Sequence, residues 1–134
     1  MNNDVWGGII SLVNYERGMY MKLNFRKHKA AQDMITLIEK DKCLSAPDAI
    51  NFSINQEIHD IILNTGWASI ALGLWGHDDP DREWNKMDNP CIEVEIEEDK
   101  LKLVDDIAQK EEVDIVTAVS YFLLFTMDKL GYHI

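Results

Sequence analysis

Cysteine and proline are scarce in this sequence, which has two of the first and three of the second among its 134 residues. Two thiols do not form the disulfide framework that stabilises small secreted domains. No run of about 18 apolar residues occurs, so no membrane-spanning helix is expected. The first residues, Met-Asn-Asn-Asp, lack the basic and apolar regions of a secretory signal. We therefore expect a cytoplasmic protein that has no membrane partner.

The motifs of common enzyme active sites are absent as well. The sequence contains no GxSxG, GxxxxGK[ST], GxGxxG or HExxH pattern. Neither Cys43 nor Cys91 has a base placed beside it by a recognisable motif. Residues 76–83 combine His77 with four carboxylates, but not at the spacing of an EF-hand loop. We expect no enzyme, catalytic residue, cofactor or metal ion; a small enzyme with an acidic or metal site near His77 is an alternative.

The charge of the chain is strongly acidic and unevenly distributed. Residues 1–42 have seven Lys or Arg and five acids, whereas residues 43–134 have six and nineteen. The local net charges are therefore +2 and −13, within a total of −11. Such a field repels nucleic acid and attracts basic proteins. A basic protein partner is expected, and direct nucleic-acid binding is not; the alternative is that the charge only maintains solubility.

The N-terminal part of the chain predicts a helix or a hairpin, followed by a clear helix. Apolar residues at helical spacing in 6–13 favour a helix, whereas Gly7 and Gly8 disfavour one. Strands at 9–13 and 19–25 are the alternative, since apolar and polar residues alternate in the second of them. From Arg26 to Cys43 an apolar stripe predicts an amphipathic helix.

Between residues 43 and 90 the pattern predicts two helices and a short helical turn. Ser53 and Gln56 match a capping box, so one helix is expected to begin there and to end near Asn64. Another is expected from Trp67 to Gly76, with Trp67 in the core. Pro80 is expected to begin a helical turn.

The last third of the chain has the clearest pattern. Apolar residues alternate with glutamates from 92 to 97, which predicts a half-buried strand near 91–97 with an acidic outer face. A helix with an apolar stripe follows around 101–108. Asp114 is expected to cap a final helix that extends to about Leu130. This helix is apolar on nearly all sides, so we expect it in the core or in a subunit interface.

Together these patterns predict a single domain spanning 1–134. Its fold class is α+β and mainly helical, with five to six helices. The small β element consists of a strand near 91–97 and, in the hairpin alternative, a second near 19–25. The length and the 46% apolar content are sufficient for one hydrophobic core.

The order strand, helix, helix between Cys91 and Gly131 resembles a ribbon-helix-helix unit. In that family two chains pair their strands, and outward residues of the strands read bases in the major groove. The corresponding positions here are Glu93, Glu95 and Glu97, which phosphates would repel. The resemblance therefore implies a dimer that does not read DNA. A strand and two helices within a monomeric core are the alternative.

Two functional hypotheses follow. The first is an acidic protein-binding inhibitor of immunity-protein or antitoxin type, which occludes the site of a basic toxin such as a nuclease. Its expected partner-binding residues are Glu93, Glu95, Glu97, Asp78, Asp79, Asp81, Glu83 and Trp84. The second is a homodimeric regulatory or scaffold protein. Its expected self-interface consists of Phe122, Leu124 and Phe125.

Overall fold

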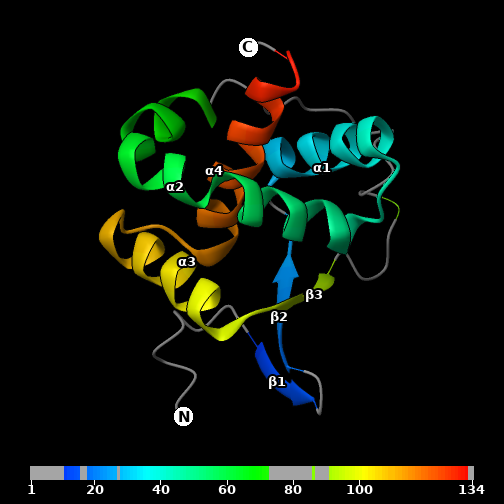
Figure 1. The fold of residues 1–134 in the computed structure, drawn as a ribbon, viewed down its shortest axis with the longest axis vertical. Helices are drawn as coiled ribbons and strands as arrows, with labels where there is room; N and C mark the ends of the chain where they lie inside the picture. The colour runs from blue at the N-terminus through cyan, green and yellow to red at the C-terminus, as the bar shows by residue number, and fades with distance from the viewer. Residues whose placement is uncertain (1–10, 16–17, 27, 73–85, 87–90, 133–134) are drawn as a thin grey trace.

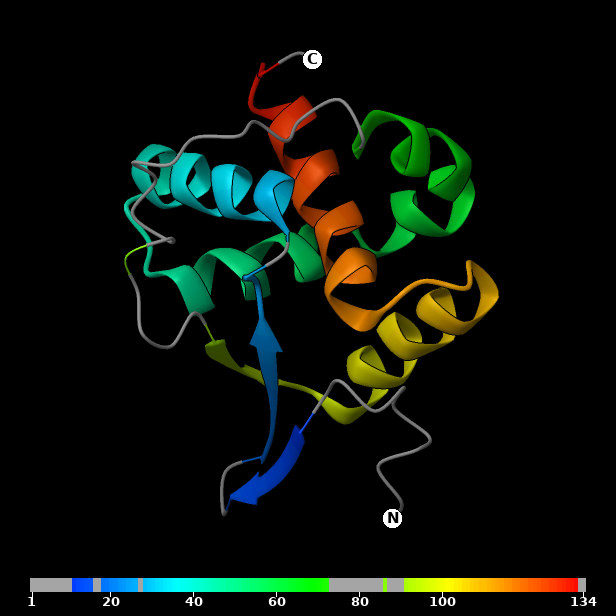
Figure 2. The same cartoon turned by 180° about the vertical axis from the view of Figure 1, so that it is seen from behind.

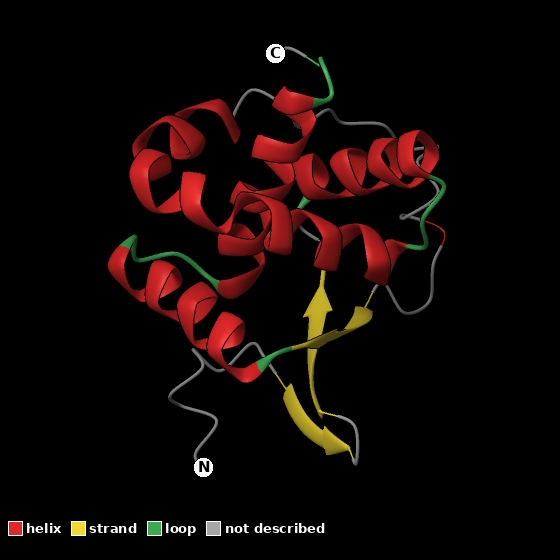
Figure 3. Cartoon of the chain, viewed as in Figure 1, coloured by secondary structure: helices red, strands yellow, loops and turns green. Residues whose placement is uncertain are grey.

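The computed structural model describes residues 11–15, 18–26, 28–72, 86 and 91–132. The strands are β1 (Ser11–Tyr15), β2 (Gly18–Asn24) and β3 (Cys91–Ile96). The helices are α1 (Lys29–Lys42), α2 (Ala46–Leu72), α3 (Glu98–Lys110) and α4 (Ile115–Lys129). The helices gather together and the small sheet extends away from them (Figure 3). The prediction of a mainly helical α+β fold is confirmed.

The N-terminal segment forms the predicted hairpin within its described residues. β1 and β2 pair in antiparallel fashion, with Ser11 opposite Lys22 and Tyr15 opposite Gly18. The helical alternative is therefore wrong for Ser11–Tyr15; residues 1–10 lie outside the described part. In β2 the side chains of Met21 and Leu23 are buried, as their alternation with polar residues predicted.

β3 joins this hairpin and completes a sheet in the order β1-β2-β3. Val94 and Ile96 are buried, and Glu93 and Glu95 are exposed, as the alternation predicted. One edge of β3 is paired with β2 of the same chain. At the other edge, Asn51 Nδ2 on α2 donates a hydrogen bond of 2.8 Å to the carbonyl oxygen of Glu95. The resemblance to a ribbon-helix-helix unit thus extends to element order, while β3 finds its strand partner within the chain.

Where two helices were expected between residues 53 and 76, the structure has one helix, α2, as far as the described residues extend, to Leu72. It begins at Ala46, after Ser45, whose carbonyl oxygen accepts from Ala49 N at 2.8 Å. Pro47 is tolerated because the first turn of a helix needs no donor there. The predicted capping box at Ser53 is wrong, since this side chain is buried inside the helix. Gly66 does not end the helix, and its backbone has open space around it.

Helix α4 lies at the centre of the helical part, between α1 and α2 (Figures 1 and 2). As predicted, Asp114 caps it, with Oδ1 accepting from Thr117 N at 2.7 Å. The exposed fractions of Phe122, Leu124 and Phe125 are 0%, 1% and 8% in a single chain. These side chains already pack inside a single chain, which does not favour the expected self-interface; that self-interface stays a prediction. Of the two locations expected for this helix, the structure shows the core.

The C-terminal part of α2 departs from expectation in its exposure. Trp67 was expected in the core, but 44% of it is exposed, and Ile70 is 77% exposed. One edge of the Trp67 ring still packs against Phe125, with 5.0 Å between ring centroids.

Among the described residues, no helix combines the length and hydropathy that spanning a membrane requires.

Asp105 on α3 is a buried carboxylate that makes a testable pH prediction. Burial is the main cause that raises its pKa; Gln109 Nε2, which donates to it at 2.6 Å, opposes the rise, and the charge of Asp106 adds to it. A raised folded-state pKa favours folding below the unfolded pKa, and this contribution is lost as pH rises through the folded pKa. At neutral pH the charged group therefore destabilises the fold.

Asp105→Asn is expected to raise the melting temperature at pH 7 by up to a few degrees. The amide oxygen can still accept from Gln109. The gain should disappear below about pH 4, the pKa of an unfolded aspartate, which thermal melts across pH would detect. Glu112→Gln, an exposed change of the same charge that is not among the causes of the Asp105 pKa shift, serves as the control. An equal gain at pH 3 and pH 7 would contradict the explanation.

Candidate functional site

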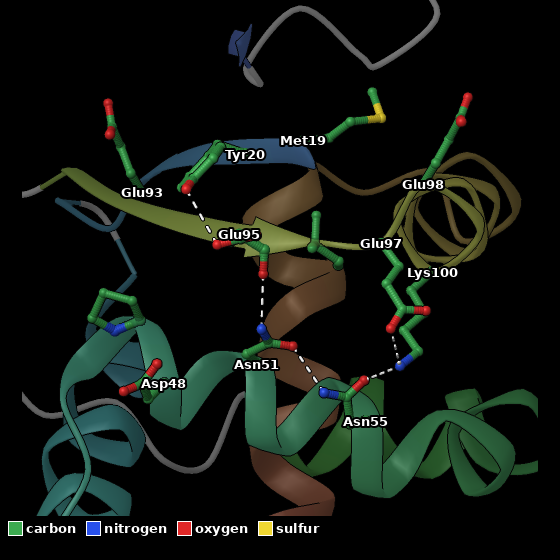
Figure 4. A pocket seen from close by; sticks show the side chains of 12 residues that line it. Met19, Tyr20, Asp48, Asn51, Asn55, Glu93, Glu95, Glu97, Glu98 and Lys100 are labelled. Atoms are coloured by element: carbon green, nitrogen blue, oxygen red, sulfur yellow. Dashed lines mark hydrogen bonds and ion pairs between the residues drawn. The ribbon is translucent and has the colours of Figure 1, made fainter. Parts of the chain in front are cut away.

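The described surface contains a groove of about 700 Å³ between the sheet and two helices. Its walls come from β2, β3, the first half of α2 and the start of α3 (Figure 4). The lining residues are Met19, Tyr20, Pro47, Asp48, Asn51, Asn55, Glu93, Glu95, Ile96, Glu97, Glu98 and Lys100. Five carboxylates and one ammonium group thus face a single concave surface.

The outer face of the sheet supplies the floor of this acidic groove. Tyr20 is opposite Glu95 in the β2–β3 register, and Lys22 is opposite Glu93. Cross-strand partners project to the same face of a sheet. The Tyr20 hydroxyl donates to Glu95 Oε2 at 3.2 Å and so holds that carboxylate over the floor. In Figure 4, Glu93 and Glu98 project to the same side, at opposite ends of the groove.

A chain of polar contacts connects β3, α2 and the start of α3 around the groove. Asn51 donates to the Glu95 carbonyl oxygen at 2.8 Å and accepts from Asn55 Nδ2 at 2.9 Å. Asn55 Oδ1 in turn accepts from Lys100 Nζ, which lies 3.6 Å from Glu97 Oε1. Glu97 occupies the N-cap position of α3, but its side chain makes no capping hydrogen bond. The contacts therefore fix the groove's walls relative to one another.

The structure brings together Glu93, Glu95 and Glu97, the three glutamates predicted as a binding row. The first two are in β3, whereas the third is in the turn to α3. The other predicted partner-binding residues are Asp78, Asp79, Asp81, Glu83 and Trp84, and they lie outside the described residues. The structure thus places the glutamate row in the groove, and partner binding by any of these residues stays a prediction.

Sequence analysis missed the wall of the groove that α2 provides. Asp48, Asn51 and Asn55 are spaced by three and four residues, which places them on one face of a helix. That spacing was a usable indication, but it required knowing that α2 begins at Ala46. Lys100 was missed as well, because its role depends on where the first turn of α3 lies.

The groove differs from a typical small-molecule pocket. Such pockets are lined mainly by apolar and aromatic side chains, whereas this lining is mostly charged or amide. Within the described ranges, no three His, Cys, Asp or Glu side chains converge as metal ligands would. The arrangement is suited to binding cationic groups of a larger molecule.

Comparison of the sequence with protein-family models and curated proteins, and of the chain with solved structures, gives no match.

Proposed function

We propose that this protein is a non-enzymatic inhibitor of immunity-protein or antitoxin type that acts in the cytoplasm. It binds a basic protein, such as a toxic nuclease, and blocks that protein's cationic surface. The observation that carries the proposal is the groove of about 700 Å³ lined by five carboxylates and one lysine. Potentials of opposite sign across an interface accelerate association and determine its specificity.

The geometry of β3 supports an extended basic segment as the part of the partner that is bound. Side chains two residues apart on a strand are separated by about 6.6 Å, so Glu93 and Glu95 project from one face at that spacing. Phosphates along an extended nucleic-acid strand have a similar spacing. The basic residues with which a nuclease binds the phosphates of its substrate therefore match the spacing of these two carboxylates.

Replacing Glu93 and Glu95 by glutamine should weaken binding of a fluorescent hexa-arginine peptide about five- to tenfold at 50 mM salt. Each substitution removes one charge and keeps the side-chain shape. Fluorescence anisotropy at 50 and 300 mM salt measures the dissociation constants, and binding should weaken with salt. The matched control is Asp106→Asn with Glu112→Gln, an equal charge change at exposed sites outside the groove. Equal weakening by both variants would mean that the net charge binds the peptide and the groove does not.

The inhibitory role requires a second experiment with a protein partner. Neighbouring gene products from the source organism would be co-expressed with this chain, and retained proteins identified at low salt. We expect one basic protein whose toxicity is neutralised by the wild type. Glu93/Glu95/Glu97→Lys, which replaces three acids with bases, should abolish retention and neutralisation together. Neutralisation that persists in this variant would refute the proposed mechanism.

A further inference from the structure

Lys100 is the one basic residue that the described chain places in the lining of the groove. Its side chain is 26% exposed, and its ammonium group lies 3.6 Å from Glu97 Oε1. The same group donates a hydrogen bond to Asn55 Oδ1 on α2. Lys100 therefore occupies a position with one carboxylate and one amide oxygen, both good acceptors for a cation.

The position of Lys100 in α3 is not explained by the stability of that helix. α3 begins at Glu98, so Lys100 is in its first turn. The N-terminus of a helix carries partial positive charge, and a cation is unfavourable there. Glu98 and Asp99, also in the first turn, have the sign that stabilises a helix start.

We propose that Lys100 is an internal competitor, a resident cation that an arginine or lysine of the partner must displace from Glu97 and Asn55. This inference rests on the proposed function of the groove. The charges specify the occupant: five carboxylates line the groove beside one lysine, and although Lys102 from outside the lining pairs with Glu98, an excess of acceptors remains for a polycationic segment. Lys100 then weakens binding of cations generally and favours partners with enough positive charge to replace it.

The inference predicts a gain of binding on loss of a lysine. Lys100→Met keeps most of the aliphatic stem and removes the charge, leaving Glu97 for the incoming group. Hexa-arginine should then bind about three- to fivefold more tightly at 50 mM salt, the range expected for one exposed ion pair. Lys100→Arg keeps the charge and should bind like the wild type.

A control must separate this local competition from the change in net charge. Lys110 is exposed at the other end of α3, about 15 Å away by the helical rise of ten residues. Lys110→Met makes the same charge change and should alter the dissociation constant less than twofold. Lys100→Gln, which retains a donor toward Asn55, is a second neutral variant in case the methionine protein does not fold.

The outcomes distinguish this inference from the proposed function. If the wild type binds hexa-arginine through Glu93 and Glu95, and Lys100→Met or Lys100→Gln binds more tightly than Lys110→Met, the inference is supported. If the groove binds but the neutral Lys100 variants bind equally or more weakly, Lys100 is a fixed structural contact and the inference is wrong. If the wild type does not bind hexa-arginine, the proposed function and the inference both fail.

Discussion

Phe122→Ala is expected to lower the free energy of unfolding by about 3–5 kcal/mol, the largest effect expected from a single substitution here. Phe122 is fully buried in α4, which lies between α1 and α2 (Figure 2). Removing its ring loses apolar burial and leaves a cavity that rigid neighbours only partly fill. Domains of this size have stabilities of roughly 5–15 kcal/mol, so the variant should be close to its unfolding limit at 37 °C. Urea denaturation monitored by circular dichroism measures the change.

The control for this prediction is Phe52→Ala, the same deletion at a half-buried position on α2. The ring of Phe52 lies beneath Lys42 Nζ, 5.8 Å from its centroid, and its loss should cost less than about 2 kcal/mol. The unfolding midpoints of the wild type and of Phe122→Ala should both be independent of protein concentration, because the lost contacts are within one chain. A midpoint that rises with concentration in the wild type and not in the variant would restore a subunit interface through Phe122.

The elements that could be predicted from the sequence are those determined by local pattern. The alternation from Ile92 to Glu97 gave both the strand and its exposed face, because a side chain's face on a strand depends only on its position. Asp114 was identified as a cap because Asp is a preferred residue just before a helix, and the structure shows its carboxylate accepting from Thr117 N, three residues later. Neither feature needs information from a distant part of the chain.

The start and end of α2 could not be predicted, because the local residue patterns that usually mark helix ends are misleading there. Ser53 and Gln56 have the residue types of a capping box, yet the surrounding core buries Ser53 in the middle of a helix. Gly66 lowers helix propensity by about 1 kcal/mol, which packing of a long helix readily offsets. Tertiary contacts thus outweighed the local sequence signals for helix ends.

The groove is a tertiary feature as well, and only its glutamate row was visible in advance. The Asn51–Glu95 hydrogen bond joins residues 44 positions apart, and the Lys100–Asn55 hydrogen bond spans 45. No periodicity within one element specifies such a meeting. The acidic imbalance after residue 42 indicated the sign of the surface, while the fold determined which carboxylates share one cavity.

An ion pair between α2 and α4, in which the carboxylate is buried and the lysine side chain is half exposed, provides the second large effect. Glu57 is 2% exposed, and its Oε1 lies 2.5 Å from Lys129 Nζ. Its Oε2 accepts from the Thr126 hydroxyl at 3.3 Å. Lys129→Met should lower the free energy of unfolding by about 2–3 kcal/mol, because a carboxylate then remains buried without its cation. Lys102→Met is the control, since its exposed pair with Glu98 is worth less than about 0.5 kcal/mol.

The double variant Glu57→Met/Lys129→Met tests the cause of that loss. Removing both charges eliminates the unpaired carboxylate and places an apolar side chain at the buried position of Glu57. Buried ion pairs replaced by apolar residues are often neutral or stabilising. We therefore expect the double variant to unfold at a urea concentration close to that of the wild type, well above Lys129→Met. If the double variant is as unstable as the single one, the stem of Lys129 stabilises the α2–α4 contact by packing, and the charge pair does not.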